Sequence, residues 1–438
     1  MLNPWLSLLL FVAVFVGLSA LARVPVAYSI GIAAMLLYLV NGLNPLGFAQ
    51  VCFSGLDTFT MLAVPFFIFA GSIMEYSGIS DRLLQWVEML IGKVRGFTGA
   101  ICVVASALFG LLTGSIMSTL SSVGKVMISK MREKGYSKEY AAALAAASSF
   151  LGILIPPSAP GIAYALASGA KVTEVWMATV VPAILIVVLY LIVNFLKRRK
   201  AEPKAEKKEA EQALVVGKRF ARSTWTAFPA LLMPIIIYGT IYGGVCTATE
   251  AGAISVVYGL GYYLVKKHIL KRQVDKPMKD IAVESSNMMA VVGMLLVFAG
   301  IAGRVFTQIG IADAIATLVA NHSSKNSFLL LCNVIFLILG MFMDINPSIL
   351  LMTPLLLPAA VQLGVEPSHF GAVMLVNLCF GNLTPPFAAT CFVSSGMAGA
   401  SFTGTIREAA PFLLVGLVAI LFTTYCPALV MWLPHALG

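Results

Sequence analysis

The chain has 438 residues, of which 59% are hydrophobic and only 11% are charged, and its formal net charge is +10. This composition excludes a water-soluble domain of the same size and is typical of a polytopic helical membrane protein. The lysines and arginines collect in short segments between apolar runs, as topology determinants do, so the positive charge does not indicate nucleic-acid binding. We therefore expect an all-helical chain that packs roughly ten or more helices in a lipid bilayer.

The residue types that usually carry catalysis or hold cofactors form no motif in this sequence. The four histidines are far apart, the seven cysteines are scattered, and neither a P-loop nor a G-x-S-x-G sequence is present. An intramembrane enzyme would need a catalytic pair, and Asp344 has no Asp, His or Lys partner nearby in sequence. We expect no catalytic residue, no cofactor and no coupling to ATP within this chain.

Four basic clusters set the predicted topology, and they lie at 93–95, 125–138, 197–222 and 266–279. If all four are cytoplasmic, the helices between them must return the chain to the same side each time. The first span then covers 1–22, residues 1–56 form N-terminal scaffold helices, and the N-terminus lies outside.

Residues 97–124 form one uncharged segment between two of these clusters, about long enough for a single crossing. A single crossing would place the two basic flanks on opposite faces of the membrane. Two half-length helices joined by a Gly, Ser and Thr turn over 113–119 would enter and leave on the same face. We predict a re-entrant hairpin over about 97–127, within a first half that spans 57–196. The alternative is an ordinary span with one misplaced basic flank.

Two proline pairs interrupt apolar runs that would otherwise be membrane helices. The sequences are GILIPPSAP at 152–160 and GNLTPPFAA at 381–389, and they predict broken helices over about 139–168 and 367–397. An interior proline lacks the N–H that the carbonyl four residues earlier would accept. Pro156 and Pro157 are therefore expected to release the carbonyls of Gly152 and Ile153, and Pro385 and Pro386 those of Gly381 and Asn382.

The charged segment over 197–222 is predicted to be a cytoplasmic linker between two halves. Scaffold helices over 223–283 follow it. The second half, 284–438, contains a segment over 326–362 that is too long for one straight helix and carries one charge. We predict a second re-entrant hairpin there, which opens from outside, and a C-terminus that also lies outside. The same element order in opposite orientation predicts an inverted-topology repeat, the usual construction of secondary transporters.

The released carbonyls predict cation sites between the breaks and the hairpin tips. An unsatisfied carbonyl is costly in hydrocarbon, and a desolvated sodium ion, which favours carbonyl and hydroxyl oxygens, is a suitable partner. The predicted sodium-binding residues are Gly114, Ser115, Ser148, Ser149, Gly152, Ile153, Asp344, Gly381, Asn382 and Thr384. The predicted substrate-binding residues are Ser118, Thr119, Ser158, Asn346 and Ser348, and half-helix N-termini would offer N–H groups to a carboxylate.

Two alternatives stay open for these residues. The proline pairs could only kink their helices, with waters and serines completing the carbonyls. Asp344 could cap a half-helix that starts near Pro347 instead of binding an ion.

The segments that carry these features resemble the large membrane subunit of tripartite ATP-independent periplasmic (TRAP) transporters. They include GMFMDINPSILLMTPLLLP, and the likeness runs from about residue 6 to residue 433. The most specific parts are the two proline breaks with their flanks, AASSFLGILIPPSAP and HFGAVMLVNLCFGNLTPPFAATCFV. The resemblance implies an elevator-type transporter of the ion-transporter superfamily in the bacterial inner membrane, driven by a sodium gradient. It also implies two partners: a periplasmic binding protein that delivers an organic acid, and a small four-helix membrane subunit. By motif, one sodium site joins the Gly114 and Ser115 tip to Ser148, Ser149 and Gly152, and the other joins the Asp344 tip to Gly381 and Thr384.

The sequence departs from the family pattern at four positions. Ile116 and Met117 follow the first tip serine where small residues are usual, Asn382 replaces a usually apolar residue, and Ala388 stands where the family has glycine. The alternative function is a stand-alone sodium/carboxylate symporter of the same superfamily that needs neither partner. The sequence does not identify the transported carboxylate.

Overall fold

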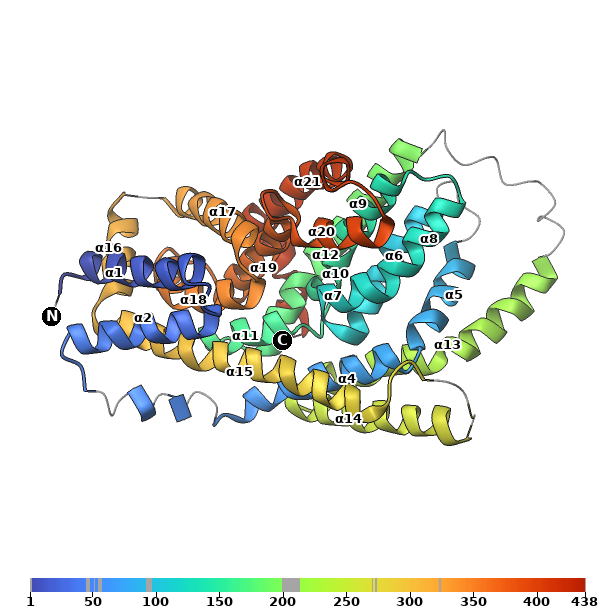
Figure 1. Cartoon of the computed structure of the whole chain (residues 1–438), viewed down its shortest axis with the longest axis horizontal. Helices are drawn as coiled ribbons and strands as arrows, with labels where there is room; N and C mark the ends of the chain where they lie inside the picture. The colour runs from blue at the N-terminus through green and yellow to red at the C-terminus, as the bar shows by residue number, and fades with distance from the viewer. Residues whose placement is uncertain are drawn as a thin grey trace.

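The structure is a computed structural model that describes residues 2–44, 48–50, 52–53, 57–91, 97–198, 213–269, 271, 274–322 and 324–437. All regular secondary structure in these ranges is helical (Figure 1), which confirms the predicted all-α class. The first half begins with α1 (Pro4–Val16), η1 (Gly17–Leu21), α2 (Val26–Val40), η2 (Phe59–Leu62), α4 (Ala63–Tyr76) and α5 (Ile79–Ile91). It continues with α6 (Phe97–Thr113), α7 (Ile116–Thr119), η3 (Leu120–Gly124), α8 (Lys125–Glu133), α9 (Lys138–Ser149), α10 (Leu151–Leu154), α11 (Ala159–Ser168) and α12 (Val172–Arg198).

The second half also contains long helices and a helix that is broken at a proline pair. It begins with α13 (Ala213–Tyr242), α14 (Ala248–Leu264), η5 (Val265–Ile269), α15 (Met278–Gln308) and α16 (Ile311–His322). It continues with α17 (Lys325–Phe342), α18 (Ile345–Gln362), α19 (Pro367–Leu383), α20 (Ala389–Ala398), α21 (Phe402–Tyr425), α22 (Pro427–Val430) and α23 (Trp432–Leu437). Because α12 reaches Arg198 and α13 begins at Ala213, the predicted linker over 197–222 is helical at both ends; residues 199–212 lie outside the described ranges.

Seven helices in the described part of the chain are long and apolar enough to cross a membrane, or up to eight if the bent pair around the first proline break counts as one span. This is fewer than the roughly ten expected from length and composition. The difference arises because breaks at Gly114 and at both proline pairs divide apolar runs into shorter helices. By contrast, α17 and α18 have 18 residues each, so either is long enough to span. The re-entrant course of the two hairpins stays a prediction.

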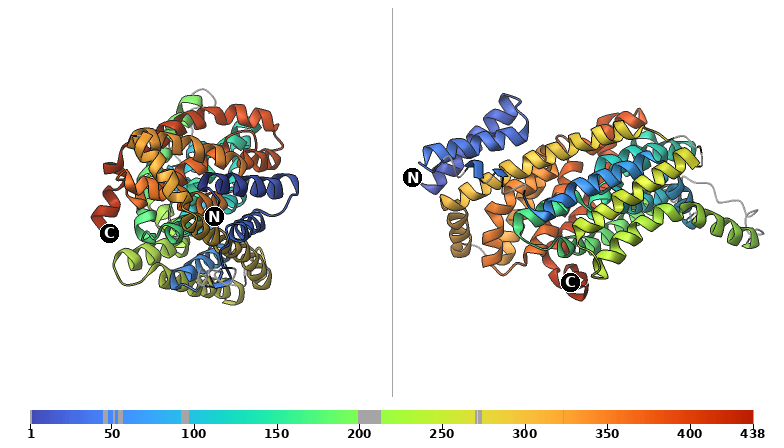
Figure 2. Two further views of the ribbon diagram at one scale, coloured as in Figure 1. Left: turned by 90° about the vertical axis from the view of Figure 1, so that its left-hand side faces the viewer. Right: turned by 90° about the horizontal axis from the view of Figure 1, so that it is seen from below.

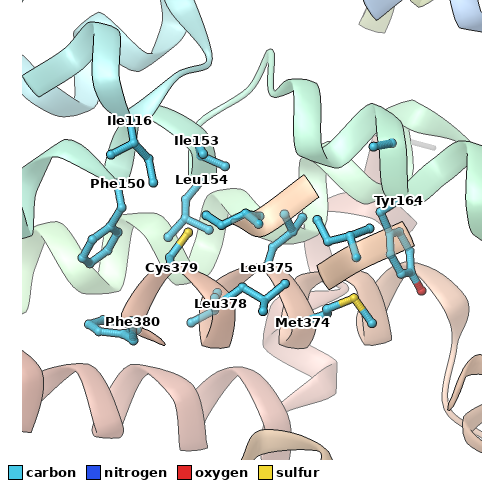
Figure 3. Packing of buried hydrophobic residues seen from close by; sticks show 14 of the residues in the cluster. Ile116, Phe150, Ile153, Leu154, Tyr164, Met374, Leu375, Leu378, Cys379 and Phe380 are labelled. Atoms are coloured by element: carbon cyan, nitrogen blue, oxygen red, sulfur yellow. The ribbon is translucent and has the colours of Figure 1, made fainter. Parts of the chain in front are cut away.

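The two helices that precede the proline pairs form the centre of the molecule. Every residue of α19 from Ser368 to Gly381 is buried, and so is every residue of α9 from Tyr140 to Ser149. Figure 3 shows side chains of α19 packed against Phe150 and Leu154 of the other broken helix. The rings of Phe150 and Phe380 meet edge to face with centroids 4.9 Å apart. A helix that is buried all round touches protein and not lipid, so the irregular backbone at the breaks is shielded from hydrocarbon.

Long outer helices flank this centre. In the right-hand view of Figure 2, α15, α4 and α14 run roughly parallel, and α4 packs against both of the others. Helix α15 packs against α2, α4 and α18, so it joins N-terminal helices to the second hairpin. A cavity lies between α15, α4 and the central broken helices.

Candidate functional site: a cavity between two helix tips and two proline breaks

The tip of the first hairpin is a two-residue break at Gly114 and Ser115. Gly114 has a φ of +58°, a left-handed conformation that favours glycine, and a Cβ atom there would overlap the carbonyl oxygen of Pro157. The Ser115 side chain caps α7 by accepting the N–H of Ser118 at 3.4 Å. The tip therefore rests directly on the first proline break, as the sequence predicted.

Close backbone packing aligns the first hairpin with this break. A Cβ atom added at Gly110 would lie 2.7 Å from the Cα atom of Gly152. A Cβ atom at Gly152 would overlap the Thr119 hydroxyl and lie 2.9 Å from the carbonyl oxygen of Ser115. Thr119 donates its hydroxyl hydrogen to the Ser115 carbonyl at 2.8 Å. The structure thus brings Ser115, Thr119 and Gly152 together.

The second hairpin meets the second break in the same way. A Cβ atom at Gly340 would lie 2.7 Å from the Leu378 carbonyl oxygen and 3.0 Å from the Cα atom of Gly381. Asp344 is the N-cap of α18, and its carboxylate accepts the N–H of Ile345 at 2.6 Å. The half-helix therefore starts at Ile345 and not near Pro347. Asp344 remains exposed, so it caps the helix and still faces open space.

Both tips and both breaks line one cavity of about 660 Å³. A volume of this size is typical of small-molecule sites. Seven of the predicted residues line it: Gly114, Ser115, Ser118, Ile153, Asp344, Asn346 and Asn382. These seven residues come from both halves of the chain, and Gly114 and Asn382 are 268 positions apart (382 − 114).

The other predicted residues do not line this cavity. They are Thr119, Ser148, Ser149, Gly152, Ser158, Ser348, Gly381, Thr384 and the four prolines Pro156, Pro157, Pro385 and Pro386. Several of the hydroxyls donate to their own helix: Ser149 to the Ala146 carbonyl, Ser348 to the Asp344 carbonyl and Thr384 to the Phe380 carbonyl. A hydroxyl that donates its hydrogen keeps oxygen lone pairs for a cation. Their role as ligands stays a prediction.

The carbonyls at the second break have replacement donors. Pro385 and Pro386 have no N–H, so neither Gly381 nor Asn382 keeps the helical donor four residues later. The carbonyl oxygen of Gly381 instead accepts the N–H of Thr384 at 2.9 Å, and that of Asn382 accepts the Thr390 hydroxyl at 3.5 Å. The bond between Gly381 and Thr384 joins residues three apart, so the last turn of α19 is narrower than an α-helical turn, as is common at helix ends. A carbonyl oxygen has a second lone pair, so either group can still take a cation.

Distant side chains supply donors to the first break. The Tyr238 hydroxyl of α13 donates to the Pro156 carbonyl. The indole Nε1 of Trp176 on α12 donates to the Ser158 carbonyl at 3.2 Å. Sequence reasoning missed both residues, because a single tyrosine or tryptophan in a long apolar helix carries no signal of its distant partner.

Two amide oxygens, one at the second tip and one at the second break, have no partner among the described residues. The side-chain oxygens of Asn346 and Asn382 are buried from solvent and accept no hydrogen bond from the residues that the structure describes. Both asparagines line the cavity beside Asp344, which is the only charged side chain among its described lining residues. An unpaired buried acceptor is costly, and a cation with several oxygen ligands would satisfy it.

The cavity wall also contains residues that sequence reasoning missed. Helix α15 contributes Asn287, Met288, Val291, Val292 and Leu295, and α4 contributes Ile68, Gly71 and Ser72. The ends of the second hairpin and break add Met341, Phe342, Met343 and Phe387. These residues lie in ordinary apolar runs, and only the fold shows which face of each helix meets the cavity.

The fold is that of a polytopic helical membrane protein, and its central cavity is lined by both tips and both breaks. The family model for the DctM component of tripartite ATP-independent periplasmic transporters matches residues 11–429. The chain belongs to this family, and it is a TRAP transporter large permease.

Characterised relatives cover most of the chain. It is 33% identical over 420 residues to an isethionate TRAP transporter permease protein, DctMQ, of Oleidesulfovibrio alaskensis, which covers 95% of this chain. The chain spans 65% of that relative's length. It is also 33% identical over 388 residues to a C4-dicarboxylate TRAP transporter large permease protein, DctM, of Pseudomonas aeruginosa, covering 87% of this chain and 88% of that one.

A solved structure shares the fold. The crystal structure of the YdaH transporter of Alcanivorax borkumensis superposes with a TM-score of 0.57 at 15% identity, over 84% of this chain and 85% of that one. At this identity the likeness concerns the fold alone.

Proposed function

We propose that this permease couples the inward movement of sodium ions to the uptake of an organic acid across the bacterial inner membrane. The observation that supports it best is the shared cavity. Asp344 and the unpaired Asn346 oxygen lie at its second tip, the unpaired Asn382 oxygen lies at the facing break, and Ser115 and Ser118 lie at the first tip. Oxygen ligands without a competing cationic side chain suit a hard monovalent cation.

The two tips suggest two sodium sites. The first combines the Ser115 tip with the break at Gly152 and Ile153, where hydroxyl and carbonyl oxygens converge. The second combines Asp344 with the break at Gly381, Asn382 and Thr384, where a carboxylate is available. Ser148 and Ser149 would complete the first site if the helix rotates or shifts when the ion binds.

The substrate carboxylate would lie between these sites. Helices α11, α18 and α20 begin at the cavity, since Ala159, Asp344 and Ala389 line it. Helix N-termini present N–H groups and a positive dipole end, and bound sodium would add to this positive potential. A carboxylate would therefore bind more tightly after sodium, which gives the coupling that symport requires.

The proposed transport cycle is of the elevator type. The two hairpins and two broken helices would form a mobile core, related by an inverted repeat, and the outer helices would form the scaffold. The matching Gly110–Gly152 and Gly340–Gly381 contacts support equivalent roles for the two halves. In this arrangement both chain termini lie in the periplasm and the segment over 197–222 lies in the cytoplasm.

Two protein partners complete the proposal. A periplasmic binding protein would deliver the acid, and a small four-helix membrane subunit would brace the scaffold. Reconstituted proteoliposomes test the proposal and separate it from a stand-alone symporter. With both partners present, uptake should require sodium, and replacement of sodium by potassium should abolish it; uptake that persists in potassium contradicts sodium coupling. Uptake that is unchanged when the binding protein is omitted favours the stand-alone carrier.

A further inference from the structure

The chemistry of the cavity wall limits which organic acids this permease can carry. Among the described residues that line the cavity there is no lysine, arginine or histidine. A second carboxylate on a substrate would therefore find no cationic side chain, and it would face the repulsion of Asp344. Burial of an unpaired charge is costly, so the cavity favours an acid with one negative charge.

Polar and apolar groups lie at different places around the cavity. Most oxygen-bearing residues collect at the two hairpin tips and the second break, whereas the facing wall of α15 presents Met288, Val291 and Val292 beside one polar residue, Asn287. Met288 is 44% exposed and Val291 is 60% exposed, so each has apolar surface available for contact. A substrate held by its carboxylate at the tips would direct the rest of its body at this wall.

Two phenylalanines extend the apolar wall on the core side. Phe342 and Phe387 line the cavity next to the second tip and the second break, and each is more than half exposed. Their rings meet edge to face with centroids 5.7 Å apart. An apolar substrate body would cover these surfaces and gain about 25 cal/mol for each Å² removed from water. A polyhydroxylated body would leave most of its hydroxyls without partners against methionine, valine and phenylalanine, because only Asn287 and Ser72 offer polar groups on α15 and α4.

We infer that the transported acid is a monoanion with a compact apolar body, and that the α15 wall around Met288 selects it. This inference rests on the proposed function, because it assigns the substrate class of the same cavity. It predicts that succinate, with two carboxylates, and gluconate, with several hydroxyls, bind more weakly than isovalerate or phenylacetate.

Thermal unfolding of the purified full chain tests this selectivity without the binding protein. A ligand that binds only the native state raises the unfolding free energy by RT ln(1 + [L]/Kd), so the unfolding temperature rises with the ratio of ligand concentration to Kd. In sodium, isovalerate or phenylacetate should produce a given shift at a roughly tenfold lower concentration than succinate or gluconate. If succinate or gluconate is the better ligand, the inference is wrong while the proposed function stands. If no acid shifts the unfolding temperature in sodium, both are overturned.

A matched pair of variants tests the role of the wall. Met288→Gln keeps the length of the side chain and adds an amide, so it should weaken isovalerate binding roughly tenfold. Met288→Leu keeps an apolar surface and should change it little. Should Met288→Gln fail to fold, Val291→Thr introduces one hydroxyl on the same wall and should have the same direction of effect. Equal affinity in the glutamine and leucine variants, or in the threonine variant and the unmodified chain, contradicts selection by α15.

Discussion

Gly340 and Gly381 approach so closely that a Cβ atom added at Gly340 would lie 3.0 Å from the Cα atom of Gly381, and Gly110 and Gly152 make the same kind of contact, at 2.7 Å, in the first half. In each case the first arm of a hairpin touches a broken helix four residues before its proline pair. The contact brings each tip to its break and so determines the shape of the cavity.

Gly340→Ala should therefore destabilise the protein. The added methyl group would meet the Leu378 carbonyl oxygen, 2.7 Å away, and backbone atoms cannot move aside as a flexible side chain can. We expect a loss of about 1–3 kcal/mol of unfolding free energy, together with reduced sodium-dependent uptake. Gly261→Ala in α14 is the matched control, since a Cβ atom there meets nothing within 4 Å. Thermal unfolding of both variants in detergent measures the difference, and equal stability of the two would contradict the role of the close contact.

Ser115→Ala and Asp344→Asn should impair different sodium sites. Ser115 lies at the first tip and Asp344 at the second, each opposite its own proline break. Each variant should raise the sodium concentration for half-maximal uptake, and Asp344→Asn should have the larger effect because it removes a charge. For independent sites, the free-energy effects should add in the double variant to within about 0.5 kcal/mol. A double variant no worse than Asp344→Asn alone would indicate one shared site.

Ala388→Gly should stabilise the second break. Ala388 is the N-cap of α20 and has a φ of 40°, in the left-handed region. This conformation destabilises a residue with a Cβ atom by about 1–2 kcal/mol. Removal of the buried methyl group costs about 0.8 kcal/mol, so the net gain should be up to about 1 kcal/mol. Ala372→Gly, at a buried and fully helical position of α19, should lose stability instead. The two unfolding temperatures should move in opposite directions, and a fall in both would show that the backbone at Ala388 is not strained.

Tyr238→Phe should loosen the first break. The Tyr238 hydroxyl on α13 donates a hydrogen bond to the Pro156 carbonyl. The substitution removes this hydroxyl and keeps the ring. The variant should lose about 1 kcal/mol of unfolding free energy and leave the Pro156 carbonyl free for solvent or an ion. Tyr258→Phe is a useful comparison, because Tyr258 donates to the Pro229 carbonyl at 2.6 Å between two outer helices. If Tyr238→Phe changes uptake and Tyr258→Phe does not, the bond to the break matters to transport.

The elements of the site that could be predicted from sequence are those with a strong local signal. Proline pairs break helices wherever they occur, and Asp344 is conspicuous in an apolar segment, so both breaks and both tips were placed correctly in sequence. Glycine at 114 and the serine that follows it are likewise recognisable as a turn.

The rest depended on how the helices are rotated against one another. Ser148 and Ser149 precede the first break by only a few residues, yet neither lines the cavity, because packing around α9 determines which face of that helix turns toward it. Met288 and Val291 could not be singled out, since an apolar face toward a cavity has the same composition as one toward lipid. The donors Tyr238 and Trp176 belong to contacts between helices far apart in the chain, which local patterns do not encode.

The single charge among the described cavity residues has an electrical consequence. With one sodium ion at each proposed site and a monoanion between them, the loaded cavity would be neutral, because two positive charges balance Asp344 and the substrate. The empty cavity would carry the one negative charge of Asp344 back across the bilayer. An inside-negative potential is worth about 2.3 kcal/mol per charge for every 100 mV and would drive that charge outward. The membrane potential would then accelerate the return of the unloaded core, and not the inward step that carries the substrate.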